Sequence, residues 1–285
     1  MKKVKITCDS TCDLTPALYE QYGVEVLPLG VTLNDKGYKD GVDISSADVF
    51  DYVAKNGILP QTSAVSVGEY LDVFGKYVAD GYEVVHINIS SEMSVCHRNA
   101  RLAADELEGV YPIDSRNLSS GSGHLVIEAA KMAAEGLDAA TIAARLDEMK
   151  QRLDVSFVLQ TLDYLRKGGR CSGIVALGAN LLQLRPEIEV AGGTMKVGRK
   201  YRGKIEKSVS DYIRGRLEGR TDLELTRIFV THSHAPREVV DAAIALVREL
   251  QPFAEVIETV AGCTISSHCG PCCLGVLFFK KEAES

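Results

Sequence analysis

The clearest indication of the fold class is the stretch "EVVHINISSEMSVCHRNARLAADELEG", residues 83–109. Its first part, "EVVHINIS" (83–90), is a short apolar run rich in β-branched residues, which predicts a buried strand. The part "VCHRNARLAADELEG" (95–109) carries apolar residues at helical spacing and stops at a glycine, which predicts a helix. The chain therefore passes from a buried strand through a polar turn into a helix.

The same alternation of strand and helix runs through the first half of the chain. Apolar strands joined by helices are typical of a mostly parallel sheet that is covered on both faces. The segment at about 20–60 interrupts the alternation with short strand-like pieces, "VEVLPLGVTL" and "KGYKDG", and we expect it to be a small insertion. The remaining predicted elements are a strand at 4–7, a helix from 67, a strand at 110–113, and helices at 123–136 and 138–153.

From about residue 155 the pattern changes to strands, helices and a hairpin. "PEIEVAGGTMKVGRK" places Gly192 and Gly193 between two alternating runs, which predicts a β-hairpin. A helix is expected over 172–184, and strands near 226–231, 254–260 and 273–281. We therefore expect an α/β protein of two domains, a mostly parallel α/β domain over 1–154 with the insertion, and an α+β domain over 155–285.

Composition excludes several classes of protein. The chain has 285 residues, a net charge of −7 and a pI near 5.5, which argue against nucleic acid as the main partner. No apolar run approaches the roughly 18 residues of a membrane span. The start, "MKKVKITCDS", turns polar at once, so we do not expect it to be a signal peptide. The eight cysteines are therefore expected to be reduced thiols of a cytoplasmic protein.

Two hydroxyl side chains precede a predicted helix in "PQTSAVSVGEY", residues 60–70. Ser66 and Glu69 have the spacing of a capping box, which accounts for the start of the helix. Thr62 and Ser63 lie ahead of this cap with no evident backbone role. They are therefore candidates for binding a ligand.

Other hydroxyl side chains also cluster between predicted strands and helices. In a parallel sheet these connections meet at the carboxyl edge, where helix N-termini and hydroxyls can bind an anion such as a carboxylate or phosphate. The alternative is that Ser and Thr simply cap helices. One interpretation is therefore that the protein binds a phosphorylated ligand at these helix N-termini. The residues of the set are Ser90, Ser91, Ser94, Ser115, Ser119, Ser120 and Ser122.

Two further stretches carry candidate ligand groups. In "LRKGGRCSG" (165–173), Arg170 follows a Gly-Gly turn and is a candidate for contacting an anion, although the stretch lacks the spacing of a P-loop. In "SSHCGPCC" (266–273), one histidine and three cysteines are close enough to suggest a metal- or thiol-dependent enzyme. The sequence lacks, however, a second pair of ligands with the standard spacing of a zinc knuckle. Alternatively the histidine is a donor that can meet a carboxylate. These four residues are His268, Cys269, Cys272 and Cys273.

Taken in order, six stretches resemble landmarks of the DegV family of bacterial fatty-acid-binding proteins. Because they run from one end of the chain to the other, the resemblance implies the family's two-domain fold, with a ligand tunnel between the domains. The six are "CDSTCDL" (8–14), "QTSAVS" (61–66), "NISSEMS" (88–94), "IDSRNLSSGSG" (113–123), "LRKGGR" (165–170) and "SSHCGPCCLGV" (266–276).

The resemblance also implies a function. One long-chain fatty acid such as palmitate is expected in the tunnel, for lipid transport or for presentation to a fatty acid kinase that phosphorylates it. The chain itself would be a carrier rather than an enzyme, with no cofactor and no metal. The residues implied to bind the carboxylate are Thr62 and Ser94, with Arg170 and His268 nearby and Ser63 and Ser91 as further donors.

The sequence departs from the family pattern in the turn after His268. The family's Gly-Pro-Gly is here Gly270, Pro271 and Cys272. A cysteine in the place of glycine tests whether this turn requires a positive φ. The "QTSAVS" stretch also lacks the family's proline, a difference that is expected to affect the shape of the tunnel and the acyl preference.

Overall fold

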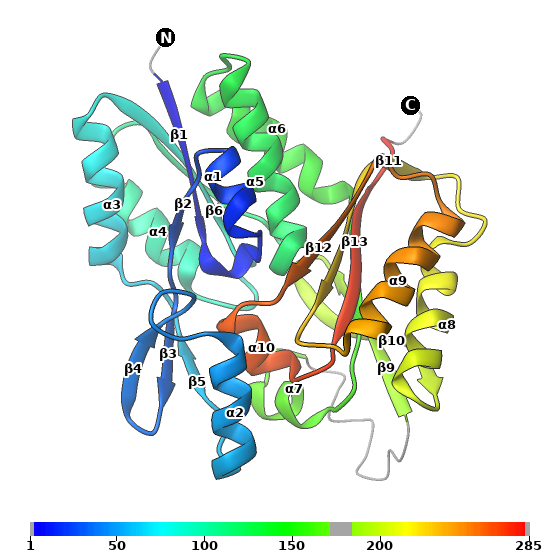
Figure 1. Cartoon of the computed structure of the whole chain (residues 1–285). Coiled ribbons are helices and arrows are strands. Elements are labelled where there is room, and N and C mark those ends of the chain that lie inside the picture. The colour runs from blue at the N-terminus through cyan, green and yellow to red at the C-terminus, as the bar shows by residue number, and fades with distance from the viewer. Residues whose placement is uncertain (1–2, 172–183, 283–285) are drawn as a thin grey trace.

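The computed structural model describes residues 3–171 and 184–282, and it contains three β-sheets connected by helices (Figure 1). The helix expected over 172–184 falls outside the described residues, except that Leu184 begins strand β9. The α/β class expected from the sequence is confirmed by the arrangement of these sheets.

The first sheet is fully parallel and has the strand order β2-β1-β6-β7. Helices α3 and α4 pack on one face, and α5 and α6 pack on the other (Figure 1). Consequently the loops that follow β1, β6 and β7 emerge at the same edge, as the strand–helix alternation predicts. The strands are β1 (Lys3–Asp9), β2 (Glu25–Leu27), β6 (Tyr82–Asn88) and β7 (Val110–Asp114).

A small antiparallel sheet, with strand order β4-β3-β5, lies beside the parallel one. Its strands are β3 (Gly30–Leu33), β4 (Lys36–Lys39) and β5 (Gln61–Ser63). Two expectations need correction here. Part of the predicted insertion, β2, joins the parallel sheet, and Thr62 and Ser63 do have a backbone role, because β5 pairs with β3.

The second half of the chain forms a six-stranded sheet in the order β10-β9-β8-β13-β11-β12. Among the strand pairs that the structure describes in this sheet, only β11 and β12 are parallel. Gly192 and Gly193 have φ of 59° and 83°, so the predicted hairpin turn needs residues that tolerate the left-handed region. The strands are β8 (Leu153–Val158), β9 (Leu184–Ala191), β10 (Thr194–Arg202), β11 (Leu223–His232), β12 (Glu255–Val260) and β13 (Leu274–Lys280).

Helix α5 (Ser119–Ala134) is packed between the parallel sheet and the six-stranded sheet. Two glycines allow this close approach. A Cβ on Gly121 would lie 2.8 Å from a methyl of Val155 in β8, and one on Gly123 would lie 2.9 Å from the carbonyl oxygen of Cys12. The helix begins four residues before the predicted start at 123, so Ser119, Ser120 and Ser122 form its first turn rather than a loop.

The other helices follow the predicted pattern with shifts at their ends. Ser66 caps α3 in a complete capping box with Glu69, as predicted. Helix α4 stops at Ala104 rather than at 109, because the chain turns before it reaches Gly109, which has a φ of 81°. The remaining helices are α1 (Pro16–Gln21), α2 (Ser46–Asn56), α3 (Val67–Ala79), α4 (Cys96–Ala104), α6 (Ala139–Met149), α7 (Asp163–Gly168), α8 (Ile205–Leu217), α9 (Arg237–Leu250) and α10 (Cys263–Cys269), with short 3₁₀ turns at Ser10–Cys12 and Lys150–Arg152.

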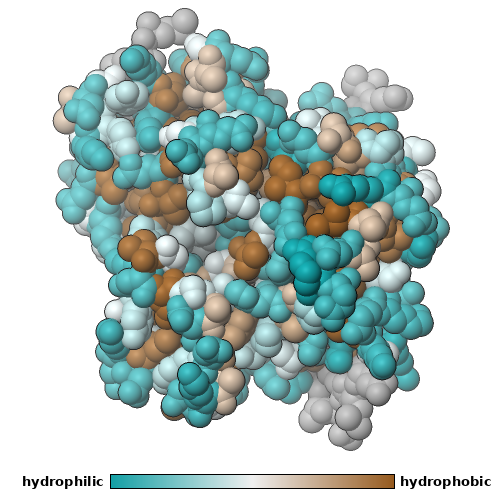
Figure 2. Space-filling view, viewed as in Figure 1, coloured by the Kyte–Doolittle hydropathy of each residue, from teal (hydrophilic) through white to brown (hydrophobic). Residues whose placement is uncertain are grey.

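The surface in Figure 2 is mostly hydrophilic, with hydrophobic residues in separate patches. Within the two described ranges, none of the helices has the length and apolar character needed to cross a lipid bilayer. The predicted boundary between residues 154 and 155 lies inside β8, the first strand of the six-stranded sheet.

Candidate functional site

A cavity of about 440 Å³ lies where the loop after β6, strand β5, helix α7 and helix α10 meet the six-stranded sheet, whose inner strands β8, β11 and β13 help to line it. This size is ordinary for a small-molecule site, for which roughly 300–1,000 Å³ is typical. The cavity brings together residues from distant parts of the sequence, such as Thr62 and His268, which are 206 positions apart. All six residues predicted to bind a carboxylate line it, namely Thr62, Ser63, Ser91, Ser94, Arg170 and His268.

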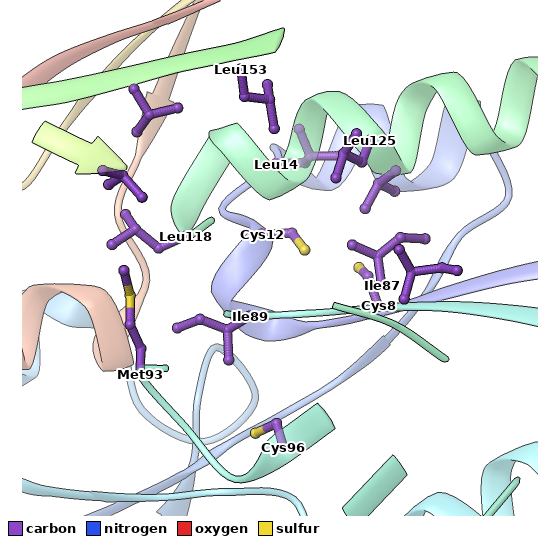
Figure 3. Close-up of a cluster of buried hydrophobic side chains, with 14 of the residues drawn as sticks. Cys8, Cys12, Leu14, Ile87, Ile89, Met93, Cys96, Leu118, Leu125 and Leu153 are labelled. Carbon is purple, nitrogen blue, oxygen red and sulfur yellow. The ribbon is translucent and has the colours of Figure 1, made fainter. Parts of the chain in front are cut away.

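Most of the remaining cavity wall is apolar. Ile89, Met93 and Leu118 lie close together below the start of α5, as Figure 3 shows. Ile265 on α10 and Met195 on β10 also line the cavity. These residues were not predicted as site residues, because an apolar side chain in a strand or helix is normally part of the core. The cavity therefore combines a polar region, formed by the predicted carboxylate-binding residues, with a larger apolar surface.

The polar region centres on a hydrogen bond between Thr62 and His268. Thr62 Oγ1 lies 2.9 Å from His268 Nε2, and His268 Nδ1 is buried with no hydrogen-bond partner among residues 3–171 and 184–282. A buried N–H without an acceptor is rarer than an unpaired lone pair, so we assign the proton to Nε2. His268 then donates to Thr62, and the hydroxyl hydrogen of Thr62 remains available for a ligand.

His268 is neutral over the physiological pH range. Burial and the nearby positive charge of Arg170 lower the pKa of His268 to about 4. Arg170 is exposed, and its guanidinium donates to the carbonyl oxygens of Gly168 and Met93. It therefore supplies the positive charge at this end of the cavity. Glu92, which also lines the cavity, is paired with Arg116 at 3.1 Å.

The serines of the predicted set differ in their availability. The hydroxyl of Ser94 accepts from the backbone N–H of Cys96 and lies 3.1 Å from the Cys96 sulfur, a weak acceptor, so its hydrogen can turn to a ligand. Ser63 is exposed at the rim. The Ser91 hydroxyl donates to Asp114 Oδ2 at 2.6 Å. Ser91 therefore lines the cavity as predicted, but its only hydroxyl hydrogen is already used.

Two buried aspartate side chains, Asp13 and Asp40, hold helix α10, which carries His268. Asp40 accepts hydrogen bonds from the backbone N–H groups of Cys263 at 2.7 Å and Thr264 at 3.0 Å. Asp13 accepts from the N–H of Gly262 at 2.8 Å. Sequence reasoning missed this role because the partners are more than 200 residues apart, and no local pattern marks them.

The structure does not favour the alternative site at the cysteines near His268. Among the residues that the structure describes, no group of three or more His, Cys, Asp or Glu side chains is placed to hold a metal ion. Cys269 and Cys273 line the cavity, and a hydrogen bond with Cys269 together with burial raises the pKa of Cys273 well above its usual range. Burial also raises the pKa of Cys272. Reactive thiols have lowered pKa values, so these findings disfavour a thiol nucleophile.

The backbone of Cys272 shows whether the turn after His268 requires a positive φ. Its φ is 57°, in the left-handed region that favours glycine. The turn therefore has a positive φ at this position although the residue is a cysteine.

Comparisons with known proteins agree with this architecture. A family model described as "Uncharacterised protein, DegV family" matches residues 3–281. A DegV domain-containing protein of Clostridium acetobutylicum is 33% identical over 287 residues, which cover 99% of this chain and 100% of the relative.

Two solved structures are similar over nearly their whole length. One is a DegV family protein from Thermus thermophilus described for its fatty acid binding, with 28% identity, a TM-score of 0.88 and coverage of 98% of this chain and 99% of that one. The other is a DegV lipid-binding protein from Thermotoga maritima, with 26% identity, a TM-score of 0.86 and coverage of 99% and 100%. The family match and these similarities together show that the chain belongs to the DegV family.

Proposed function

We propose that this protein is a cytoplasmic carrier that binds one long-chain fatty acid such as palmitate in the cavity and has no catalytic activity of its own. The observation that carries the proposal is the combination of Thr62, Ser94, His268 and Arg170 at one end of a cavity whose wall is otherwise largely apolar. The fatty acid binding described for the similar Thermus thermophilus protein supports it.

The two parts of the cavity match the two parts of a fatty acid. Hydroxyl donors and one guanidinium offset the desolvation of a carboxylate. Burying an acyl chain contributes about 0.8 kcal/mol per CH₂, so roughly 14 methylenes give a gross term of about 11 kcal/mol. A phosphorylated metabolite would gain little from the apolar wall, so the cavity favours an acid with a long hydrocarbon chain.

A second hollow of about 280 Å³ is lined in part by the same polar residues. It shares Thr62, Arg170 and His268 with the cavity and is also lined by Lys167. Under the proposal, this hollow gives a fatty acid kinase access to the bound carboxylate. The basic stretch "KVGRKYRGK" (196–204), most of which lies on the edge strand β10, is the proposed docking face for that kinase.

Replacing the hydroxyl donors tests the proposed carboxylate site. Thr62→Val and Ser94→Ala are each expected to weaken palmitate binding by about tenfold or more, because a hydrogen bond to a charged group contributes about 1.5–3 kcal/mol. Isothermal titration calorimetry on delipidated protein measures the dissociation constants.

Ser91→Ala is the comparison within the same cavity. Its affinity for palmitate is expected to stay near that of the unmodified protein, because the Ser91 hydroxyl already donates to Asp114. Equal affinities for all three variants and the unmodified protein would contradict the assignment of the head-group site.

Gly168→Ala is expected to weaken palmitate binding about tenfold. Alanine has a higher helix propensity than glycine, so the substitution does not lower the helix propensity of α7 itself. A Cβ on Gly168 would overlap His268 Nδ1, so the imidazole must move and its hydrogen bond to Thr62 breaks. Gly75→Ala in α3 is the matched control, because a Cβ there meets nothing within 4 Å. If Gly168→Ala binds palmitate as tightly as Gly75→Ala, the role given to His268 is wrong.

A further inference from the structure

The turn of the β9–β10 hairpin lies against the loop at 89–95, which joins β6 to α4. This loop supplies several of the residues that line the cavity. Met195, two residues after Gly193 in the hairpin, also lines it. The contact between the turn and the loop therefore joins two cavity walls that come from different halves of the chain.

Two side chains hold the hairpin turn in this position. Ser90 Oγ donates to the carbonyl oxygen of Gly193 at 2.7 Å, and the guanidinium of Arg116 donates to the carbonyl oxygen of Gly192. The same guanidinium pairs with Glu92 at 3.1 Å, so it connects the turn to the cavity-lining loop. We call Ser90 and Arg116 the hairpin latch.

The latch is closely packed, and its backbone conformation is unusual. A Cβ on Gly193 would lie 2.8 Å from Ser90 Oγ and 2.7 Å from the central guanidinium carbon of Arg116. Arg116 has a φ of 51°, in the left-handed region that residues other than glycine seldom adopt. Its backbone N–H donates to Asp114 at 2.9 Å, which stabilises this conformation. Backbone strain of this kind is concentrated at functional sites, which favours a role for Arg116 beyond a surface ion pair.

Helix α5 joins the two halves of the chain by contacts that are more deeply buried. His124 Nε2 lies 3.0 Å from the carbonyl oxygen of Leu277, and the buried Arg227 pairs with Glu128 at 2.7 Å. The side chain of Arg116, by contrast, is 34% exposed, so water can replace its hydrogen bonds at a small cost. The latch is therefore easier to open than the contacts of α5.

The cavity also reaches the surface beside the latch. Glu92 and Val95 line the cavity and are exposed. Among the described strands of the six-stranded sheet, β10 is at the edge and pairs only with β9. The hairpin can therefore bend away from the loop without breaking the pairing of β10 with a third strand, and this movement widens the cavity toward solvent.

We propose that the acyl ligand enters and leaves the cavity between the hairpin turn and the loop at 89–95, and that the latch of Ser90 and Arg116 sets the rate of this exchange. The inference rests on the proposed function and adds how the same site opens. Because the latch holds the closed form with or without a ligand, it slows uptake and release by the same factor. Arg116 is thus a positioning residue, since it acts through the hairpin and not through contact with the ligand.

Arg116→Asn weakens the latch with little strain, since asparagine tolerates a positive φ but is too short to reach Gly192. Rapid filtration with radiolabelled palmitate measures uptake by delipidated protein and release into excess unlabelled palmitate. Both rates are expected to be about three- to tenfold higher than in the unmodified protein. The dissociation constant from calorimetry is expected to change by less than about twofold, because the two rates rise together.

Arg214→Asn is the matched control. Arg214 is 40% exposed and pairs with Glu218 and Glu249, neither of which lines the cavity. Its exchange rates are expected to equal those of the unmodified protein. Unchanged rates in Arg116→Asn, or a weaker affinity without faster uptake, would overturn the inference alone. Failure of the unmodified protein to bind palmitate would overturn the proposed function as well.

A disulfide across the latch is expected to have the opposite effect. The close approach of Gly193 to the Ser90 hydroxyl brings the Cβ atoms of the double variant Ser90→Cys, Gly193→Cys into disulfide range. After oxidation with glutathione disulfide, this variant is expected to exchange palmitate at least about tenfold more slowly than after reduction with dithiothreitol. The unmodified protein, treated in the same way, should show no difference. A variant whose mass proves the cross-link, but whose exchange rates are equal in both states, would contradict the proposed route.

Discussion

Raising the pH from about 6 to about 9 is expected to remove about 3 kcal/mol of stability through Asp13 alone. Burial raises the pKa of Asp13 to about 8, with a smaller contribution from the nearby charge of Asp40. Because this folded-state value lies above the unfolded value of 3.8, the contribution of Asp13 is fully present below pH 3.8. It is lost as the pH rises toward and through about 8.

Asp13→Asn isolates this contribution. Asparagine resembles the protonated carboxyl, because its amide oxygen can accept from Gly262 and its NH₂ can donate to Ser119. It also tolerates the positive φ of 49° at this position. Urea denaturation at both pH values should give a smaller fall in the free energy of unfolding for Asp13→Asn than for the unmodified protein. Equal falls for the two proteins would show that Asp13 does not titrate in this range.

Asp40→Ala is expected to destabilise the protein by about 3 kcal/mol. The substitution removes the acceptor of two backbone N–H groups at the start of α10 and of the Ser10 hydroxyl. A helix of seven residues has little stability of its own, so these groups cannot be held by helix propensity alone. Because α10 carries His268, palmitate affinity is expected to fall together with stability.

Asp138→Ala is the control for Asp40→Ala, since Asp138 caps α6 at the surface by accepting from Thr141. When Asp138 is replaced by alanine, the backbone N–H of Thr141 can bond to water instead. The loss of unfolding free energy, measured by urea denaturation, should therefore be clearly smaller for Asp138→Ala than for Asp40→Ala. If the two variants lose the same free energy of unfolding, the special role of Asp40 is refuted.

The features that the sequence predicted correctly have local causes. The capping box of Ser66 and Glu69 and the turn at Gly192 and Gly193 depend on residues only a few positions apart, and the structure confirms both. The strand–helix alternation places the loops after parallel strands at one edge, which explains why Ser94 lines the cavity.

The features that the sequence did not predict depend on partners far away in the chain. Strand β5 exists because it pairs with β3, and the Ser91 hydroxyl is used by Asp114, which follows a different strand. Asp13 lies 249 residues before Gly262, so no spacing rule connects them. Gly168 matters only because His268 packs against it.

The most direct test of the central claim is native mass spectrometry of the protein purified without added lipid, followed by analysis of the released ligand. The account predicts a mass increment of a single long-chain fatty acid on the unmodified chain and its loss in the double variant Thr62→Val, Ser94→Ala. Lipid-free protein that also fails to take up added palmitate would contradict the account.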